Sequence, residues 1–328
     1  MAVNPMGWPS ELVQVVEHSV TAELSTLTKA GGPITTPVTP YPGPAGDTID
    51  VSTGVTYPAK AERARRNPRV ALLFADPLGY PGAPVVLVQG LASVRDADLQ
   101  ANTDRYVALS AAKLPETVKG RPKLLLRRMG WYYARIWIQV TPLHVRWWHG
   151  SDLSEPARQW DAPADTAAVL SDPPPTGTQP PPWKAPVEWR GLAAHALDRL
   201  PLHDLTVVDS NGFPVCLPVA ETRLVAEGIE VRLGTGAPEL RPGPACFTAH
   251  GHPARFSGQE NHSLVGRLEA RDNGSLLLRV ERALGDWSAT GGPLRMGIGF
   301  LSKGRVLGPR LRREAARRNQ PVPKVRFP

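Results

Sequence analysis

Cysteine is scarce in this sequence: Cys216 and Cys246 are the only two among 328 residues. Two thiols cannot supply a disulfide framework or a zinc site built from cysteines, so both stabilising devices are excluded. The chain also lacks any apolar run near the roughly 20 residues that a transmembrane helix needs. Its first residues show neither the basic start nor the apolar stretch of a secretory signal peptide. We therefore expect a cytoplasmic protein without a membrane span.

Acidic residues are almost missing from the end of the sequence. Residues 303–328 contain nine lysines and arginines and one acid, Glu314, which accounts for the whole formal net charge of +8. The rest of the chain is balanced, so its composition gives no reason to expect nucleic-acid binding by the folded body. We interpret the segment as a solvated basic tail. Two alternatives stay open: the tail contacts nucleic acid or an anionic membrane, or it folds over a cofactor groove.

Proline and glycine, by contrast, are abundant, with 36 and 30 residues. They favour strands and turns over long helices, and short apolar strands between them predict a mainly β fold with a small barrel and short helices. Prolines cluster at 173–175 and 180–182, within a segment, 151–190, that we interpret as an extended linker. This linker divides the chain into a first unit, 1–150, and a second unit, 191–302.

The second unit repeats the order of elements of the first. The matching segments are 33–38 with 214–219, 53–54 with 235–236, and 71–75 with 245–249. The spacing from Thr53 to Ala71 is 18 residues, whereas that from Thr235 to Ala245 is 10. The second copy therefore lacks an equivalent of the short helix predicted at 59–66, and we expect it to be a degenerate barrel.

The most informative stretch for chemistry follows the third predicted strand. Ser52 and Thr53 end that strand, and a short basic helix with Lys60 and Arg66 comes next. Hydroxyls, backbone N–H groups at a helix start and a cation together can bind phosphate. Because charge runs commonly just face water, the alternative is a solvated helix beside a capping hydroxyl.

Four ordered motifs in the first unit resemble the pyridoxamine-phosphate-oxidase-like family, the flavin and deazaflavin split β-barrels. They are Thr-Pro-Val at 36–38, Ser-Thr-Gly at 52–54, Lys-x-x-Arg-x-x-Arg-Asn-Pro-Arg-Val-Ala-Leu at 60–72, and Val-Gln-Gly-Leu-Ala at 88–92. The resemblance covers about residues 10–150. With the internal repeat, it implies tandem split β-barrels.

The resemblance also implies a cofactor and its ligands. In the family, FMN or the deazaflavin coenzyme F-420 lies in a groove between two barrels. The implied cofactor-binding residues are Ser52, Thr53, Lys60 and Arg66 for the phosphate, Thr36, Pro37 and Val38 along the ring, and Gln89 and Gly90 on a bordering strand. Because the second copy has no equivalent of Lys60, we expect it to hold no phosphate. The second copy would then replace a partner subunit in an intrachain pseudo-dimer; a homodimer of two-unit chains is the alternative.

The implied activity is an FMN- or F-420-dependent oxidoreductase that transfers hydride to a small molecule. The cofactor performs that chemistry, so no catalytic protein residue is assigned. Alternatives are a non-catalytic module of the same fold that binds flavin or haem, and association with nucleic acid or membrane through the tail. We interpret His250, His252 and His262 as polar loop residues and assign no metal site.

Overall fold

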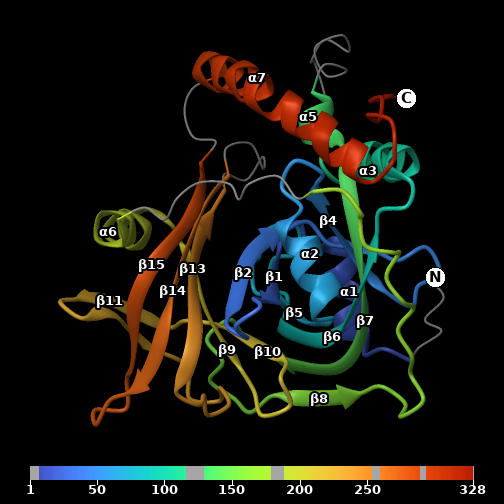
Figure 1. The fold of residues 1–328 in the computed structure, drawn as a ribbon. Coiled ribbons are helices and arrows are strands. Elements are labelled where there is room, and N and C mark those ends of the chain that lie inside the picture. The colour runs from blue at the N-terminus through green and yellow to red at the C-terminus, as the bar shows by residue number, and fades with distance from the viewer. Residues whose placement is uncertain (1–6, 116–128, 179–187, 253–258, 289–292, 328) are drawn as a thin grey trace.

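The computed structural model describes residues 7–115, 129–178, 188–252, 259–288 and 293–327, with the side chains of 285–302 left out. Two curled antiparallel sheets, joined by a long segment, make up the molecule, and a C-terminal helix crosses above them (Figure 1). Among the described residues, none of the helices combines the length and apolar character that a membrane span requires.

The first sheet has the strand order β2-β1-β5-β6-β7-β4-β3, and β8 pairs with β7. Its strands are β1 (Ala22–Leu27), β2 (Pro33–Val38), β3 (Tyr41–Pro42), β4 (Ile49–Gly54), β5 (Arg69–Phe74), β6 (Val85–Arg95), β7 (Arg135–Trp148) and β8 (Arg158–Asp161). Its helices are α1 (Ser10–His18), α2 (Ala59–Arg66), α3 (Leu99–Lys113) and α5 (Gly130–Tyr133).

The second sheet follows the same path, β10-β9-β13-β14-β15-β12-β11. Its strands are β9 (Leu202–Val208), β10 (Pro214–Pro218), β11 (Glu221–Val225), β12 (Gly228–Arg232), β13 (Gly243–Gly251), β14 (Glu260–Ala270) and β15 (Leu276–Ser288). Helix α6 (Trp189–Arg199) precedes β9 as α1 precedes β1. The predicted tandem split β-barrels are therefore confirmed.

The second copy is the reduced one. The described residues 233–242 join β12 to β13 without a helix, and a turn at 271–275 stands where the first copy has α3.

The strand register shifts the alignment of the two copies, 71–75 with 245–249, by one residue. Ser25 pairs with Ala71, and its equivalent Thr206 pairs with Cys246, so Cys246 rather than Ala245 corresponds to Ala71.

Strand β5 explains how the two sheets hold together. Its side chains alternate between faces, as in any strand. Val70, Leu72 and Phe74 enter the core of the first barrel, whereas Ala71 and Leu73 enter a core shared with the second sheet. Both faces are buried, which accounts for the continuous apolar run of this strand.

The basic C-terminal segment is packed, so the expectation of a solvated tail is wrong here. Helix α7 (Pro293–Arg317) buries Leu307, Leu311 and Ala315 against the first barrel. Glu314 and Arg318 are also buried, at 0% and 8% exposure. The apolar positions recur every three to four residues, and this helical stripe is what attaches the segment.

Candidate functional site

The predicted phosphate ligands lie on strand β4 and on helix α2, which follows it in the chain. Ser52 and Thr53 lie on β4, which pairs with β7 so that Gly54 stands opposite Arg135. A Cβ on Gly54 would lie 3.3 Å from Nη1 of Arg135, so the glycine leaves room for the guanidinium. The Thr53 hydroxyl donates to the carbonyl of Tyr57, which fixes the turn that leads into α2.

Three cations meet at this end of the first barrel, and the described residues place no acid between them. Burial, together with the charges of Arg63 and Arg135, lowers the pKa of Lys60 to about 7. Among the described residues, Lys60 has neither an ion-pair partner nor a hydrogen bond. Burial also lowers the pKa of Arg63 to about 10. A half-buried ammonium group beside two guanidinium groups is unfavourable unless an anion joins them.

Aromatic rings and a hydroxyl hold the two arginines in place. Arg135 donates to the Tyr106 hydroxyl at 2.8 Å, and its guanidinium carbon lies 4.1 Å from the Tyr106 ring centroid and 5.0 Å from that of Tyr132. Its buried Nε has no hydrogen-bond partner in the described structure. Arg63 donates from Nε to the Thr26 hydroxyl at 2.8 Å. Both guanidinium groups therefore keep donors available for an anion.

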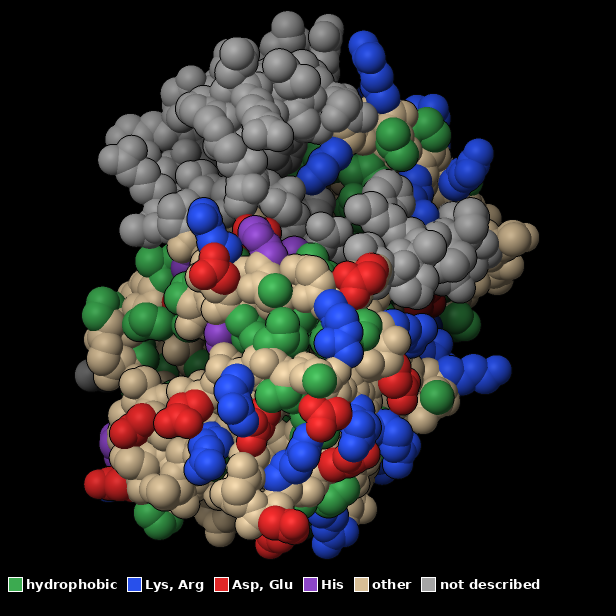
Figure 2. Space-filling view, turned by 90° about the vertical axis from the view of Figure 1, so that its left-hand side faces the viewer, with side chains coloured by type: hydrophobic (Ala, Val, Ile, Leu, Met, Phe, Trp, Pro, Cys, Tyr) green, Lys and Arg blue, Asp and Glu red, His purple; other side chains and the backbone are tan. Residues whose placement is uncertain are grey.

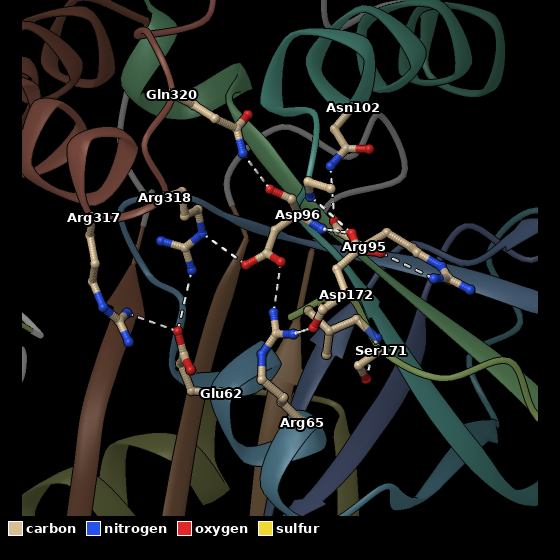
Figure 3. Close-up of polar contacts among 12 residues, drawn as sticks. Glu62, Arg65, Arg95, Asp96, Asn102, Ser171, Asp172, Arg317, Arg318 and Gln320 are labelled. Carbon is tan, nitrogen blue, oxygen red and sulfur yellow. Dashed lines mark hydrogen bonds and ion pairs between the residues drawn. The ribbon is translucent and has the colours of Figure 1, made fainter. Parts of the chain in front are cut away.

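Two acids, Glu62 on α2 and Asp96 after β6, pair with arginines of the C-terminal segment (Figure 3). Glu62 Oε1 lies 2.9 Å from Arg317 Nη1 and 3.3 Å from Arg318 Nη2. Asp96 pairs with Arg65 at 2.7 Å and with Arg318 at 2.9 Å. On one face of α2 the charges of acids and arginines therefore balance one another. The other face, with Lys60 and Arg63, stays cationic.

Edge strand β2 continues the site toward the second sheet. Ile34 pairs with Thr26, whose hydroxyl accepts from Arg63, and it packs against the buried Cys246 of β13. Thr36 shares a face of β2 with Ile34, and its hydroxyl is buried without a hydrogen-bond partner among the described residues. A buried unpaired hydroxyl is costly, which marks Thr36 as a position for a polar ligand atom.

The remaining residues predicted for the phosphate and the ring are Pro37, Val38, Arg66 and Ser52. Pro37 and Val38 follow Thr36 on β2, and Arg66 is exposed at the end of α2, near Arg63. Ser52 is partly buried on β4. Their contact with a cofactor stays a prediction.

Packing within the chain explains why a glutamine stands at position 89 and a glycine at position 90. The Gln89 amide donates to Asp209 Oδ2 at 2.8 Å and to the Pro214 carbonyl at 3.0 Å, which links β6 to the second sheet. At Gly90 a Cβ would lie 2.4 Å from the Thr141 carbonyl oxygen, at an irregularity in the β6–β7 pairing. A place for either residue beside a cofactor also stays a prediction.

The histidines do not form the predicted polar loop. His250 is buried on β13, with Nε2 3.0 Å from Glu23 and 3.4 Å from Asp204. Burial opposes its protonation, but the contacts with the two carboxylates outweigh burial and raise the pKa of His250 to about 10. His252 pairs with Asp76 at 2.5 Å. These contacts tie the second sheet to the first.

Sequence reasoning missed Arg135 and the role of the C-terminal segment. Arg135 lies two residues after the aromatic run Trp131–Tyr133, and that run was the available signal because aromatic rings hold guanidinium groups. The pairing of Arg317 and Arg318 with Glu62 and Asp96 joins residues more than 200 positions apart and left no local signal.

Comparison with known proteins gives matches among solved structures only. Neither a family model nor a curated protein matches this sequence. A Clostridium acetobutylicum protein related to general stress protein 26, of the pyridoxinephosphate oxidase family, is 13% identical, with 46% of this chain and 92% of that chain covered and a TM-score of 0.32. An F-420 reductase is 17% identical, with 43% and 97% covered and a TM-score of 0.31. A haem storage protein from Vibrio cholerae is 14% identical, with 40% and 87% covered and a TM-score of 0.28. Proteins of the family that the sequence motifs resemble are therefore among the structural matches.

Proposed function

We propose that the chain binds FMN or coenzyme F-420 between α2 and edge strand β2, and that it acts as an oxidoreductase on a small molecule. The observation that carries this proposal is the cluster of Lys60, Arg63 and Arg135, three cations without an acidic partner among the described residues. A phosphate group would supply the missing negative charge and accept their hydrogen bonds.

The residues present fit both parts of such a cofactor, its phosphate and its ring. Its phosphate would meet Lys60, Arg63 and Arg135, with the hydroxyls of Ser52 and Thr53 beside them. Its ring would lie along β2, where Thr36 offers an unpaired hydroxyl to a polar ring edge. FMN and F-420 both combine a phosphate with a planar ring, so the same residues accommodate either.

In this proposal the cofactor, when bound, supplies the hydride chemistry. The chain's residues bind and orient it. The cationic cluster anchors one end, and the backbone of β2 and the Thr36 hydroxyl align the ring. The second sheet, which packs against β2 through Thr248 and Ser263, limits access of water from that side.

Binding of each cofactor to the tag-free full-length protein tests the proposal. Quenching of FMN and F-420 fluorescence should report binding at micromolar concentrations for at least one of them. Lys60→Ala should weaken that binding roughly 10- to 100-fold, as expected for a lost charged hydrogen bond. Lys29→Ala removes the same charge from an exposed turn and serves as the control. The cofactor proposal fails if neither compound binds, and the site is misplaced if Lys60→Ala binds as the parent does.

Oxidoreductase activity needs a separate measurement. The bound cofactor should be reduced chemically and then mixed anaerobically with small acceptors, for example quinones, while its absorbance is followed. Reoxidation that depends on the acceptor supports an enzyme. A cofactor that binds but never exchanges electrons with any acceptor supports a storage or sensing module instead.

A further inference from the structure

A second cluster of chemistry-bearing side chains lies outside the proposed cofactor site, on the second sheet. His195 of α6 and Glu260 and His262 of β14 bring one ligand atom each to within 4.8 Å of one another. Nε2 of His195 lies 2.8 Å from Glu260 Oε1, and Nε2 of His262 lies 3.0 Å from that same oxygen. Figure 2 views the face that carries α6, where histidine side chains reach the surface beside acidic ones.

The fold positions these three groups with little freedom. Glu260 and His262 are two residues apart on β14, so both side chains point to the same face of the sheet. Helix α6 packs across that face, with Ala193 and Ala196 buried beneath it. The His262 ring is 2% exposed and is therefore held by packing, and the two imidazole rings meet edge to face with centroids 5.7 Å apart.

We infer that His195, Glu260 and His262 form a binding site for a divalent transition metal of the zinc class. Two imidazole nitrogens and one carboxylate oxygen are a donor set that Zn²⁺ uses when one coordination position stays open. Ligand atoms around tetrahedral Zn²⁺ are about 3.3 Å apart at Zn–N and Zn–O distances near 2.0–2.1 Å. The present contacts of 2.8 and 3.0 Å therefore need only a small outward movement to admit the ion.

Exposure decides what the site can do. His195 and Glu260 are 48% and 14% exposed at their side chains, so the fourth coordination position faces solvent and is open to water. The ion would also connect α6 to β14, two elements that are more than 60 residues apart. Metal binding should therefore stabilise the fold. The bound ion would also hold a water molecule as its fourth ligand.

Direct metal binding by the tag-free full-length protein tests this site. Co²⁺, a spectroscopic substitute for Zn²⁺, should give the intense visible absorption of four-coordinate cobalt, and Zn²⁺ should abolish it and raise the melting temperature. His195→Ala should weaken Zn²⁺ binding about tenfold or more, because it removes one of three ligands. The exposed position of His195 favours an intact fold for this variant, and circular dichroism checks it.

His144→Ala is the matched control. His144 also pairs with a single carboxylate, Asp161 at 2.7 Å, but is not part of a three-ligand group among the described residues. Its removal should leave Zn²⁺ affinity unchanged. The inference is overturned if the parent protein binds no Zn²⁺ at micromolar concentrations, or if folded His195→Ala binds as tightly as the parent.

Discussion

Arg318 near the C-terminus and Asp96 after β6 form a buried ion pair, with Arg318 Nε 2.9 Å from Asp96 Oδ2 and both side chains at most 3% exposed. Asp96 also accepts from Arg65 of α2 at 2.7 Å. One carboxylate thus connects the turn after α7 to α2, the helix that carries Lys60 and Arg63. Gln320 reinforces the connection by donating to the Asp96 carbonyl at 2.7 Å.

Replacing Asp96 by alanine should therefore destabilise the protein strongly. The change leaves Arg65 and Arg318 without this carboxylate in buried positions, and breaking a buried pair from one side costs about 3–5 kcal/mol. Chemical denaturation followed by tryptophan fluorescence measures the change. Asp104→Ala is the control, because Asp104 pairs with exposed Arg326 at 3.4 Å and should cost less than about 1 kcal/mol. Equal losses in the two variants would show that the tail is not held by Asp96.

Cofactor binding should depend on pH through Lys60. Its pKa is lowered to about 7 in the free protein, so the ammonium form that attracts phosphate is lost as pH rises above that value. Affinity should fall by up to about tenfold per pH unit above pH 7 until the pKa of the complex is reached. Lys60→Arg keeps its charge and should bind with nearly constant affinity over the same range. A parent protein whose affinity is flat between pH 7 and 9 would exclude Lys60 as a phosphate ligand.

The shared core between the sheets should be sensitive to Leu73. This side chain is fully buried between β5 and the second sheet, and Leu73→Ala should cost about 2–5 kcal/mol of unfolding free energy. Leu170→Ala makes the same chemical change at a position that is 86% exposed and should stay within about 0.5 kcal/mol of the parent. If only the second sheet melts early in Leu73→Ala, hydrogen exchange will show the two sheets losing protection at different denaturant concentrations.

The triad of Glu23, Asp204 and His250 predicts a stability difference that depends on pH. The folded-state pKa of His250, about 10, lies above the unfolded value near 6.5, so its stabilising contribution is complete below pH 6.5 and is lost as pH rises through 10. Burial raises the pKa of Glu23 to about 7, so both carboxylates are ionised at pH 8 while His250 is still charged. His250→Gln should be less stable than the parent by several kcal/mol at that pH, because two buried carboxylates lose their cation. The gap should narrow toward pH 10. A gap that stays constant would mean that His250 is neutral in the folded protein.

One chain should bind one cofactor molecule. Helix α2 has no counterpart among residues 233–242 of the second copy, so the second barrel cannot repeat the cationic cluster. The second sheet already covers the face of β5 and β6 through a shared core, and we expect a monomer of 35.5 kDa rather than a homodimer. Light scattering and a fluorescence titration give mass and stoichiometry together. A stable dimer would favour the alternative of two-unit chains that pair through their first barrels.

Local patterns in the sequence determined the fold class, and they predicted a phosphate site at 52–66 that binding experiments have to test. Strand alternation, glycine turns and the repeated order of elements are short-range features, so the two barrels and the missing helix of the second copy could be read from them. The one-residue error in aligning Ala71 arose because apolar strands look alike when shifted, whereas pairing with Ser25 fixes the register.

Long-range charge pairing, by contrast, was decided by the tertiary structure. The sequence shows that the net charge of +8 belongs to residues 303–328, but not where those cations go. The fold pairs Arg317 and Arg318 with Glu62 and Asp96, which leaves Lys60 and Arg63 as the cationic face of α2. It likewise brings His195 to Glu260 and His262. Partners distant in sequence meet only when packing of apolar faces sets the geometry, so composition alone could not reveal them.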